Sequence, residues 1–304
     1  MNASKRTAIV TGGAGFLGSH TVERLLGDGF RVRVIDLPSA LYETNLAACA
    51  KDPNLEIERG DLLEFDASDK VFADADYIFH CSAIGEHVQS ANTPELLIRA
   101  NVLAVIRVLE AARHYGVKKV IYPSSAAVYG IAEAPTREDF PISPQNAYGM
   151  SKEMAEIAFR RWDTIYGVSS VCFRIFNGYG PRAAKSGVVG VFLEKKLKGE
   201  PIGILGDGGA ERDFIYVSDI VDAFLLSTNT EGSGLYNLGS GVTRTVKELA
   251  TLIGGPIDYG PAREGEPPVI LADISSVQRD LGWRPTVSLE QGITNVLDSL
   301  GLEN

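Results

Sequence analysis

The sequence predicts an α/β fold, a doubly wound parallel sheet followed by a smaller C-terminal α/β lobe. Short apolar runs alternate with helix-length stretches through the first half of the 304-residue chain. This alternation is typical of a parallel sheet with right-handed crossovers. After Asn177, the breaker cluster 178–181 interrupts the pattern, and the later elements are shorter and richer in glycine and proline. The 45% hydrophobic content is enough for one large core and part of a second.

The elements of the large sheet follow in order along the chain. The predicted strands are Thr7–Thr11, Arg31–Asp36, Leu55–Arg59, Tyr77–His80, Val120–Pro123 and Val171–Arg174. The predicted helices between and after them are Gly15–Asp28, Asn101–Tyr115 and Tyr148–Tyr166. In such a sheet, ligands bind at the C-terminal ends of the strands.

The domain boundary is expected near residue 180. This gives a dinucleotide-binding domain over residues 1–180 and a substrate-binding lobe over 181–304. The apolar run Asp213–Val217 is expected to be a strand that returns to the large domain, so a segment near 213–240 should belong there. The two lobes would then be interleaved in sequence.

Charge and cysteine usage argue against several classes of protein. The net charge is −10 and no basic cluster is present, which argues against binding to a nucleic-acid backbone. The N-terminal run lacks the apolar stretch of a signal peptide, and no later segment is expected to span a membrane. Cys49, Cys81 and Cys172 lack metal-ligand or CxxC spacing, so we expect no metal site and reduced thiols in a cytoplasmic protein.

A glycine motif connects the first strand to the first helix. Its spacing is Gly12-x-x-Gly15-x-x-Gly18. Glycines there permit a tight turn and a close approach of the backbone to a pyrophosphate, which rests on the positive end of the helix. In this strand–turn–helix context the motif predicts a Rossmann dinucleotide site that includes Phe16 and Leu17.

Acidic residues end the next two strands. Asp36 is placed to accept hydrogen bonds from a ribose diol and to repel a 2′-phosphate, which favours NAD over NADP. Arg33 would favour a phosphate, but strand alternation puts it on the opposite face. Asp61 at the third strand either holds the adenine amino group, with Leu62 in the same site, or caps a helix.

Tyr148 and Lys152 stand four residues apart, which places both side chains on one face of the predicted helix. A Lys ammonium near a phenol, with an oxidised nicotinamide close by, lowers the Tyr pKa. Such a Tyr can take a proton from a sugar hydroxyl while a hydride leaves the same carbon. A Ser in the 124–125 pair, after the strand Val120–Pro123, would face the same crevice.

At this point the sequence resembles the extended short-chain dehydrogenase/reductase family, in its nucleotide-sugar epimerase/dehydratase branch. The resemblance covers essentially the whole chain. The matching runs are TGGAGFLGSH, VIDLPS, GDL, NVLAVIRVLEAA, PSSAAVYG, NAYGMSK, FRIFNGYGPR, GDGGAERDFIYVSDIVDA, YNLGSG and ADISSVQRDLGW.

The resemblance implies roles for three catalytic residues and one cofactor residue. Tyr148 would be the base and Lys152 its electrostatic partner, both beside the NAD. Ser125 would be the third catalytic group, because it directly precedes the Ala-Ala-Val-Tyr-Gly run. Asn101 would belong to the cofactor site. Ala104 stands where relatives often have Gly, which we interpret as a packing difference.

The resemblance also implies substrate contacts. Asn177 would contact the substrate, and Arg212 and Arg263 would clamp a nucleotide diphosphate through bidentate contacts. From the sequence alone, each Arg could equally form a local ion pair with its acidic neighbours. In this family, helices such as 101–115 and 148–166 pair across a two-fold axis, so a homodimer is expected.

The residues after Ser125 narrow the chemistry. Relatives that eliminate water or carbon dioxide carry an acid there, whereas this chain has Ala126 and Ala127. The Ser-Tyr-Lys set suffices for a reversible hydride transfer at sugar C4, so we expect an NAD-dependent 4-epimerase acting on a UDP-hexose or UDP-N-acetylhexosamine. A 4-keto-sugar reductase is the alternative of the same fold, and a non-enzymatic NAD sensor is a third hypothesis.

Three further positions bear on specificity. Glu86 and His87 lie near the expected sugar pocket and either select the substrate or are solvated loop residues. Ile270 falls where some UDP-glucose epimerases carry a bulky Tyr that walls the pocket. A smaller wall would leave room for an N-acetyl group.

Overall fold

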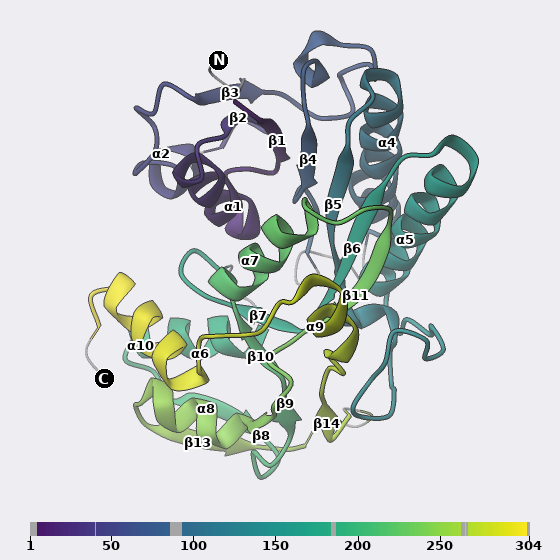
Figure 1. The fold of residues 1–304 in the computed structure, drawn as a ribbon. Coiled ribbons are helices and arrows are strands. Elements are labelled where there is room, and N and C mark those ends of the chain that lie inside the picture. The colour runs from purple at the N-terminus through teal and green to yellow at the C-terminus, as the bar shows by residue number, and fades with distance from the viewer. Residues whose placement is uncertain are drawn as a thin grey trace. The chain divides into compact units, whose positions relative to one another are not determined.

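The computed structural model describes residues 5–39, 41–85, 93–183, 187–262, 265 and 267–302. The chain divides into two compact units (Figure 1). Unit 1 consists of Met1–Val128, Pro144–Arg174 and Phe224–Leu235, and unit 2 consists of Tyr129–Ser143, Ile175–Ala223 and Tyr236–Asn304.

Unit 1 contains most of a seven-stranded sheet with the strand order β11-β6-β5-β4-β1-β2-β3, and the last residues of β6 and β11 belong to unit 2. The pairs β3–β2, β2–β1, β1–β4 and β4–β5 are all parallel. The chain places β2 and β3 on one side of β1 and then β4 and β5 on its other side, so the strand order reverses at β1. The strands are β1 Thr7–Thr11, β2 Arg31–Asp36, β3 Leu55–Arg59, β4 Tyr77–His80, β5 Lys119–Ser125, β6 Ser170–Ile175 and β11 Gly234–Leu238. This order is that of a doubly wound dinucleotide-binding sheet, which confirms the predicted fold class.

The helices of unit 1 cover the sheet. In Figure 1, α4 and α5 run together beside β4, β5 and β6, and α1 lies beside β1 and β2. The helices are α1 Phe16–Gly27, α2 Leu41–Asn45, α3 Pro94–Ile98, α4 Ala104–Tyr115 and α5 Ala147–Tyr166, with short turns η1 Lys70–Phe72, η2 Arg99–Leu103 (a π-helical turn) and η3 Ala126–Val128.

Helix α5 begins and ends where its sequence predicts. Asn146 caps it, because its side-chain oxygen accepts a hydrogen bond from the Gly149 backbone N–H at 2.8 Å. Gly167 ends it in the left-handed conformation, with φ of 70°. The cap fixes the position of the first turn, and Tyr148 lies in that turn.

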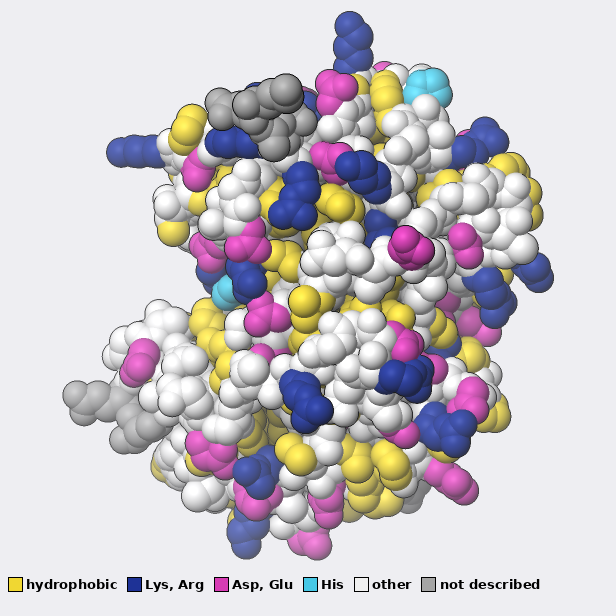
Figure 2. Space-filling model, viewed as in Figure 1, with side chains coloured by type: hydrophobic (Ala, Val, Ile, Leu, Met, Phe, Trp, Pro, Cys, Tyr) yellow, Lys and Arg dark blue, Asp and Glu magenta, His cyan; other side chains and the backbone are white. Residues whose placement is uncertain are grey.

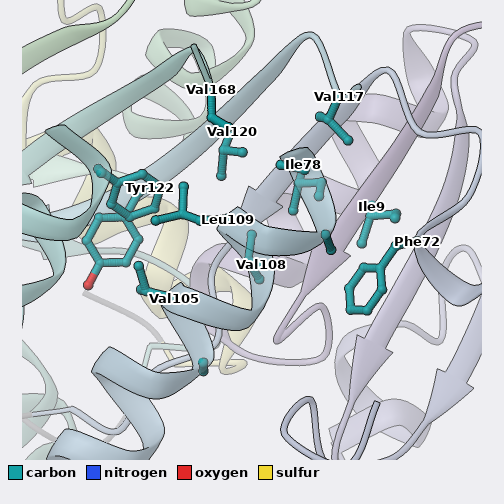
Figure 3. Close-up of a cluster of buried hydrophobic side chains, with 14 of the residues drawn as sticks. Ile9, Phe72, Ile78, Val105, Val108, Leu109, Val117, Val120, Tyr122 and Val168 are labelled. Carbon is teal, nitrogen blue, oxygen red and sulfur yellow. The ribbon is translucent and has the colours of Figure 1, made fainter. Parts of the chain in front are cut away.

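Apolar side chains from the strands and from α4 form the core of unit 1 (Figure 3). Phe72 lies at one end of this cluster and Tyr122 at the other, with Ile78 and Val120 between them. These side chains are almost completely buried. Each such residue contributes about 1.5–3 kcal/mol of transfer free energy, so this face holds α4 and α5 firmly against the sheet.

Unit 2 contains smaller sheets: the parallel pair β10-β7, the three-stranded sheet β12-β9-β14 and the parallel pair β13-β8. Its strands are β7 Asn177–Tyr179, β8 Ile202–Leu205, β9 Glu211–Arg212, β10 Phe214–Tyr216, β12 Arg244–Thr245, β13 Ile257–Gly260 and β14 Val269–Ile270. The helices of this part are α6 Gly187–Leu197, α7 Val217–Ser227, α8 Val246–Ile253, α9 Ser275–Leu281 and α10 Leu289–Ser299. The end of α7 belongs to unit 1.

Two buried carboxylates connect the loops of unit 2. Asp213 accepts hydrogen bonds from Ser240, from Gly241 and, at 3.1 Å, from the Ala272 backbone N–H. Asp219 accepts two hydrogen bonds from Thr286 and one from the Val287 backbone N–H. Trp283, which is buried, donates to the Asp219 carbonyl at 2.8 Å. Through these contacts the segment that carries Asp213 and Asp219 is bound to the loops that carry Ser240, Ala272 and Thr286.

Three predicted details were wrong. The strand before the catalytic segment is longer than 120–123, because β5 continues through Ser125. The helix predicted from Asn101 is part of a longer helical run that starts at Pro94 and passes through the π-helical turn Arg99–Leu103 into α4. The strand at 213–217 does not return to the large sheet; β10 pairs with β7, and β11 is the strand that joins β6.

The sequence predicts that the large domain includes a segment near 213–240, and unit 1 takes up Phe224–Leu235 from that range, while Tyr129–Ser143 lies in unit 2. The segment Phe224–Leu235 lies in unit 1 because its backbone is bound there. Lys119, a buried residue of β5, donates to the carbonyls of Ser227 and Thr230 and to the Thr230 hydroxyl. Hydrophobic periodicity cannot reveal such a contact between residues more than a hundred positions apart.

Candidate active site

The glycine turn has the geometry that a bound pyrophosphate requires. Gly12 has φ of 67°, and a Cβ there would lie 2.7 Å from the Ser82 backbone. A Cβ at Gly18 would lie 2.1 Å from the Gly12 carbonyl oxygen. At Gly15 the Gly12 carbonyl, at 3.1 Å, is the only protein atom that a Cβ would meet among the described residues, so this face of the turn is open. Gly15 also begins α1 without a side-chain cap.

Asp36 holds the same turn. Its carboxylate accepts a hydrogen bond from the Ala14 backbone N–H at 2.9 Å and one from the Leu37 N–H at 2.8 Å. Burial raises the pKa of Asp36, and the two backbone hydrogen bonds oppose this. Arg33 donates to the carbonyls of Val71 and Ala73, so its guanidinium is on the other face, as predicted. The open glycine face beside a strand-end acid fits a dinucleotide with an unmodified ribose.

The other predicted cofactor residues lie around this turn or at the neighbouring strand ends. Phe16 and Leu17 form the half-buried first turn of α1. Asp61 accepts a hydrogen bond from the Leu63 N–H at 2.9 Å, which is a local turn contact. It does not cap a helix, because the next helical turn, η1, begins only at Lys70. Leu62 is buried in the core cluster of unit 1. Contact of these residues with a cofactor stays a prediction.

Asn101 ties three segments together at the C-terminal edge of the sheet. Its amide oxygen accepts from the Ile84 N–H at 2.8 Å, and its amide nitrogen donates to the Ile84 carbonyl and to the Ser151 hydroxyl, both at 3.0 Å. It lies in the π-helical turn η2, and such turns are frequent at functional sites. Asn101 thereby fixes the loop after β4 against the helix that carries Tyr148.

Tyr148 and Lys152 lie on one face of α5. The Lys152 ammonium is 5.7 Å from the centroid of the Tyr148 ring and donates a hydrogen bond to the Pro123 carbonyl at 2.8 Å. Lys152 is buried, with 2% of its surface exposed, and this burial lowers its pKa to about 8. A positive charge at this distance favours the phenolate of Tyr148. Tyr148 itself is half-buried, so its ring remains accessible from one side.

The structure distinguishes the two adjacent serines. Ser124 is buried, and its hydroxyl donates to the Glu156 carboxylate at 2.5 Å. Ser125 is half-buried at the end of β5, and its hydroxyl accepts a hydrogen bond from the Ala127 N–H at 3.1 Å. Ser125 therefore stands at the strand end with a hydroxyl proton available for donation, whereas Ser124 is used in a structural contact.

A close helix contact brings Ser125 and Tyr148 into one site. Helix α5 packs on η3, the turn directly after Ser125. A Cβ on Gly149 would lie 2.6 Å from the Ala127 carbonyl oxygen. Only glycine permits this approach, so the residue after Tyr148 sets how near the two catalytic segments can come.

The predicted substrate residues belong to unit 2 where they are described. Asn177 begins β7, and its backbone N–H donates to the Asp213 carbonyl at 3.0 Å. Arg212 is buried, and its guanidinium donates to the carbonyls of Glu211 and Pro267. Ile270 is the neighbour of Arg212 across the β9–β14 pair. Arg263, Glu86 and His87 lie outside the described residues.

Sequence reasoning missed a buried polar group beneath the catalytic residues. The His80 ring and the Thr11 hydroxyl share a hydrogen bond of 2.7 Å between the ends of β4 and β1. Burial, and to a lesser extent the Lys152 charge, lower the pKa of His80 to about 3, so it is neutral near pH 7. Burial also raises the pKa of Cys81 to about 12. A polar residue ending an otherwise apolar strand was the available signal.

Sequence reasoning also missed the buried ion pair beside Lys152. Arg174 of β6 binds Glu156 in a two-pronged contact, with nitrogen–oxygen distances of 3.0 and 2.7 Å. Both side chains are nearly inaccessible to solvent. Glu156 follows Lys152 by four residues, so the spacing Tyr-x-x-x-Lys-x-x-x-Glu was visible in the sequence.

A metal site, a membrane-spanning helix and a basic surface patch are three further features that would point to other functions. In the part of the chain that the structure describes, no three His, Cys, Asp or Glu side chains gather as metal ligands. None of the described helices is both long and apolar enough for a membrane span. Basic and acidic side chains are intermixed on the face shown in Figure 2, without a continuous basic patch.

Comparison with known proteins gives the same assignment over the whole chain. Residues 8–239 match the NAD dependent epimerase/dehydratase family. A UDP-glucose 4-epimerase of Mycolicibacterium smegmatis is 34% identical over 303 residues, covering 95% of this chain and 97% of that protein.

Two solved structures show the same fold at comparable identity. A UDP-N-acetylglucosamine 4-epimerase from Methanobrevibacter ruminantium M1, in complex with UDP-N-acetylmuramic acid, has a TM-score of 0.92 and 31% identity over 98% of this chain and 99% of that one. A UDP-glucuronic acid 4-epimerase from Bacillus cereus, with UDP-glucuronic acid and NAD, has a TM-score of 0.89 and 27% identity over 97% and 99%. With its glycine turn, strand-end acid and Tyr-Lys helix, this chain belongs to the NAD-dependent epimerase/dehydratase family of extended short-chain dehydrogenases.

Proposed function

We propose that this protein is an NAD-dependent nucleotide-sugar 4-epimerase, which inverts C4 of a UDP-hexose or UDP-N-acetylhexosamine through a transient 4-keto intermediate. One observation carries the proposal. Tyr148 and Lys152 lie on one face of α5, which packs on the turn directly after Ser125, and the residues that follow Ser125 are two alanines in place of an acid. The site thus holds the groups for proton transfer and lacks an acid at the position where elimination would need one.

Each of the three residues has a distinct task. Tyr148 takes the proton from the C4 hydroxyl and later returns one to the same oxygen. The Lys152 ammonium stabilises the phenolate during this transfer. Ser125 donates a hydrogen bond to the C4 oxygen. The glycine turn and Asp36 would hold NAD, which would supply reversible hydride transfer at C4.

The remaining buried carboxylate of the site is not placed for elimination or decarboxylation. Glu156 follows Lys152 on α5, but Arg174 and Ser124 bind both of its oxygens. Because hydrogen-bond donors occupy both of its oxygens, this carboxylate is held in a structural contact and is not free to reach a substrate. Ala126 supplies no side-chain proton either. This favours epimerisation over the other reactions of the family.

The substrate assignment follows from unit 2 and from the relatives. Arg212 and Asn177 are proposed to bind the UDP-sugar, with Arg263 as the second diphosphate ligand. The three similar enzymes described above have a UDP-sugar in their names, which supports UDP as the nucleotide. NAD is expected to stay bound through many turnovers, because the reaction has no net oxidation or reduction.

The test is a panel of UDP-, GDP-, TDP- and CDP-sugars, with UDP-glucuronic acid included, incubated with the protein as purified. Products are resolved by NMR. Inversion at C4 without added cofactor is the expected result. Dependence on added NADPH with net reduction would instead identify a 4-keto-sugar reductase and refute the proposal.

The size of residue 270 is proposed to set the tolerance for an N-acetyl group. Ile270 lies next to Arg212 in the sheet of unit 2, so its side chain is adjacent to a proposed diphosphate ligand. We expect turnover of both UDP-glucose and UDP-N-acetylglucosamine by the natural protein. Ile270→Tyr should lose the acetylated sugar selectively, with Ile270→Val as the control. No acceptance of the acetylated sugar by the natural protein would rule this out.

We also propose that the protein is a homodimer and is located in the cytoplasm. The three cysteines form no disulfide, which suits a reducing compartment. Helix α5 exposes an apolar row to solvent, including Met150, Met154 and Ile157. Such a row supports self-association through this helix.

A further inference from the structure

The Lys152 ammonium lies near two aromatic rings. One belongs to Tyr148, at 5.7 Å from the ring centroid. The other belongs to Tyr122 of β5 and is closer, at 4.6 Å. Tyr122 has no assigned part in the reaction, and its ring is nearly inaccessible, with 1% exposed.

The Tyr122 ring is held rigidly. Phe159 packs against it with a centroid separation of 4.8 Å, and the His80 ring stacks on it at 5.8 Å and 18°. In Figure 3, Tyr122 lies at the end of the apolar cluster, next to Leu109 and Val105. The hydroxyl of Tyr122 is buried and makes no hydrogen bond within the described part of the chain. The ring and not the hydroxyl therefore makes the contacts at this position.

A buried ammonium needs compensation for its lost water. The Pro123 carbonyl supplies one hydrogen bond to Lys152. The negative face of an aromatic ring stabilises a cation within about 6 Å of its centroid, and the effect is larger where water is excluded. The other titratable groups that act on Lys152 or lie beside it come from β4, β6 and α5; they are His80, Cys81, Cys172, Glu156 and Tyr148. Burial lowers the pKa of His80 to about 3, so it is neutral near pH 7, and Glu156 is paired with Arg174 of β6.

We propose that Tyr122 is a positioning residue for the reaction: its ring face holds the Lys152 ammonium charged and in place beneath Tyr148 through a cation–π contact. This rests on the proposed function for its catalytic meaning. The contact itself is a property of the protein and can be measured without substrate.

The test replaces the ring by near-isosteric rings of decreasing electron density. Tyr122→Phe is the reference, because it removes only a hydroxyl that has no partner. Fluorinated phenylalanines with one and three fluorines are then introduced at position 122 in the full chain. Fluorination withdraws electron density from the ring face while the size hardly changes, so the fold is retained.

The first readout is the Lys152 titration. The protein is labelled with [ε-¹³C]lysine, the Lys152 signal is assigned with Lys152→Met, and its pKa is followed by NMR. We expect Tyr122→Phe to match the natural protein, and the trifluorinated ring to lower the Lys152 pKa by roughly half a pH unit or more. A Lys152 pKa that does not respond to fluorination would overturn the proposal.

The second readout is activity against pH. The alkaline limb of kcat/KM should move to lower pH by the same amount as the Lys152 titration, while activity well below that limb stays near the reference. A uniform loss of activity at every pH, with an unmoved limb, would show a merely structural role. If no nucleotide sugar is turned over, the proposed function fails, but the NMR series still decides whether the ring holds the charge.

Discussion

At the scale of single residues, the proposed base Tyr148 lies near a lysine that burial makes less basic. Lys152 has a pKa lowered to about 8 by burial, and it lies beside a phenol that must lose a proton. The proposed mechanism needs a charged Lys152 beside an ionisable Tyr148, so we expect activity to fall where Lys152 deprotonates.

The first prediction concerns the base. Tyr148→Phe removes the hydroxyl that accepts the proton and keeps the ring, so turnover should fall by about 10²–10⁴-fold. NAD binding, measured by fluorescence or calorimetry, should change little. Near-normal activity of the variant would contradict the assignment of Tyr148 as base.

The second prediction concerns the neutral His80 and acid stability. Its folded pKa of about 3 is far below the value near 6.5 expected when unfolded, so the unfolded chain binds the extra proton between these pH values. Stability contributed by neutral His80 is therefore present above about pH 6.5 and is lost as pH falls toward 3, by about 1.4 kcal/mol per pH unit.

The measurement is urea unfolding of the natural protein and of His80→Gln. Between about pH 6.5 and about pH 5, the natural protein should lose about 2 kcal/mol more than the variant. An equal loss in both proteins would show that His80 is not the titrating group.

At the scale of elements, the glycine turn and helix α1 offer a matched pair of substitutions. A Cβ at Gly18 would overlap the Gly12 carbonyl, whereas a Cβ at Gly27, in the last turn of the same helix, meets no atom within 4 Å. Gly18→Ala should abolish NAD binding and destabilise the fold by about 1–3 kcal/mol. Gly27→Ala should stabilise it by about 0.5–1 kcal/mol.

Calorimetric NAD titration and thermal unfolding check both variants. Retained NAD affinity in Gly18→Ala would show that the turn can shift without loss of the site. Destabilisation by Gly27→Ala would show that the helix end is less open than the structure indicates.

The clamp formed by Glu156, Arg174 and Ser124 joins α5, β6 and β5. Glu156→Gln leaves the Arg174 guanidinium buried without a counter-charge, so stability should fall by about 3–5 kcal/mol. Ser124→Ala breaks one hydrogen bond to a charged group and should cost about 1.5–3 kcal/mol. Glu153→Gln, which removes the same charge from the same helix, should stay within about 0.5 kcal/mol.

Urea unfolding measures all three variants. The double replacement Glu156→Leu with Arg174→Met should recover most of the loss, because a buried pair can be replaced by apolar side chains of similar volume. A Glu156→Gln protein as stable as the Glu153 control would contradict the clamp.

At the scale of the whole molecule, the exposed side of α5 is the feature that proposes self-association. Met150, Met154 and Ile157 follow one another at helical spacing and are 38%, 40% and 41% exposed. A dimer of this 32.7 kDa chain should be seen by light scattering. Met154→Glu with Ile157→Glu should yield monomers, because two carboxylates would be buried unpaired at the interface.

Ile131→Glu serves as the control, since Ile131 is exposed but lies away from α5 in the sequence. It should leave the mass unchanged. A natural protein that is monomeric at all concentrations tested would end the dimer proposal.

The sequence by itself determined the order of the elements, the glycine turn and the face shared by Tyr148 and Lys152. These are local properties. Hydrophobic periodicity, capping residues and backbone freedom each depend on a few neighbouring residues, so a short segment of sequence is enough to predict them. The fold class followed because alternating strands and helices admit few topologies.

Only the tertiary structure decided which strand returns to the large sheet, which serine is free to act and what surrounds Lys152. The sequence predicts the return near 213–240, with 213–217 as the expected strand, and the strand that joins the large sheet is β11 at the end of that range. The ring of Tyr122, the neutral His80 and the Arg174–Glu156 pair meet Lys152 or its neighbours from different strands. Such contacts join residues far apart in the chain, and their effect on a charge depends on burial, which a linear pattern does not contain.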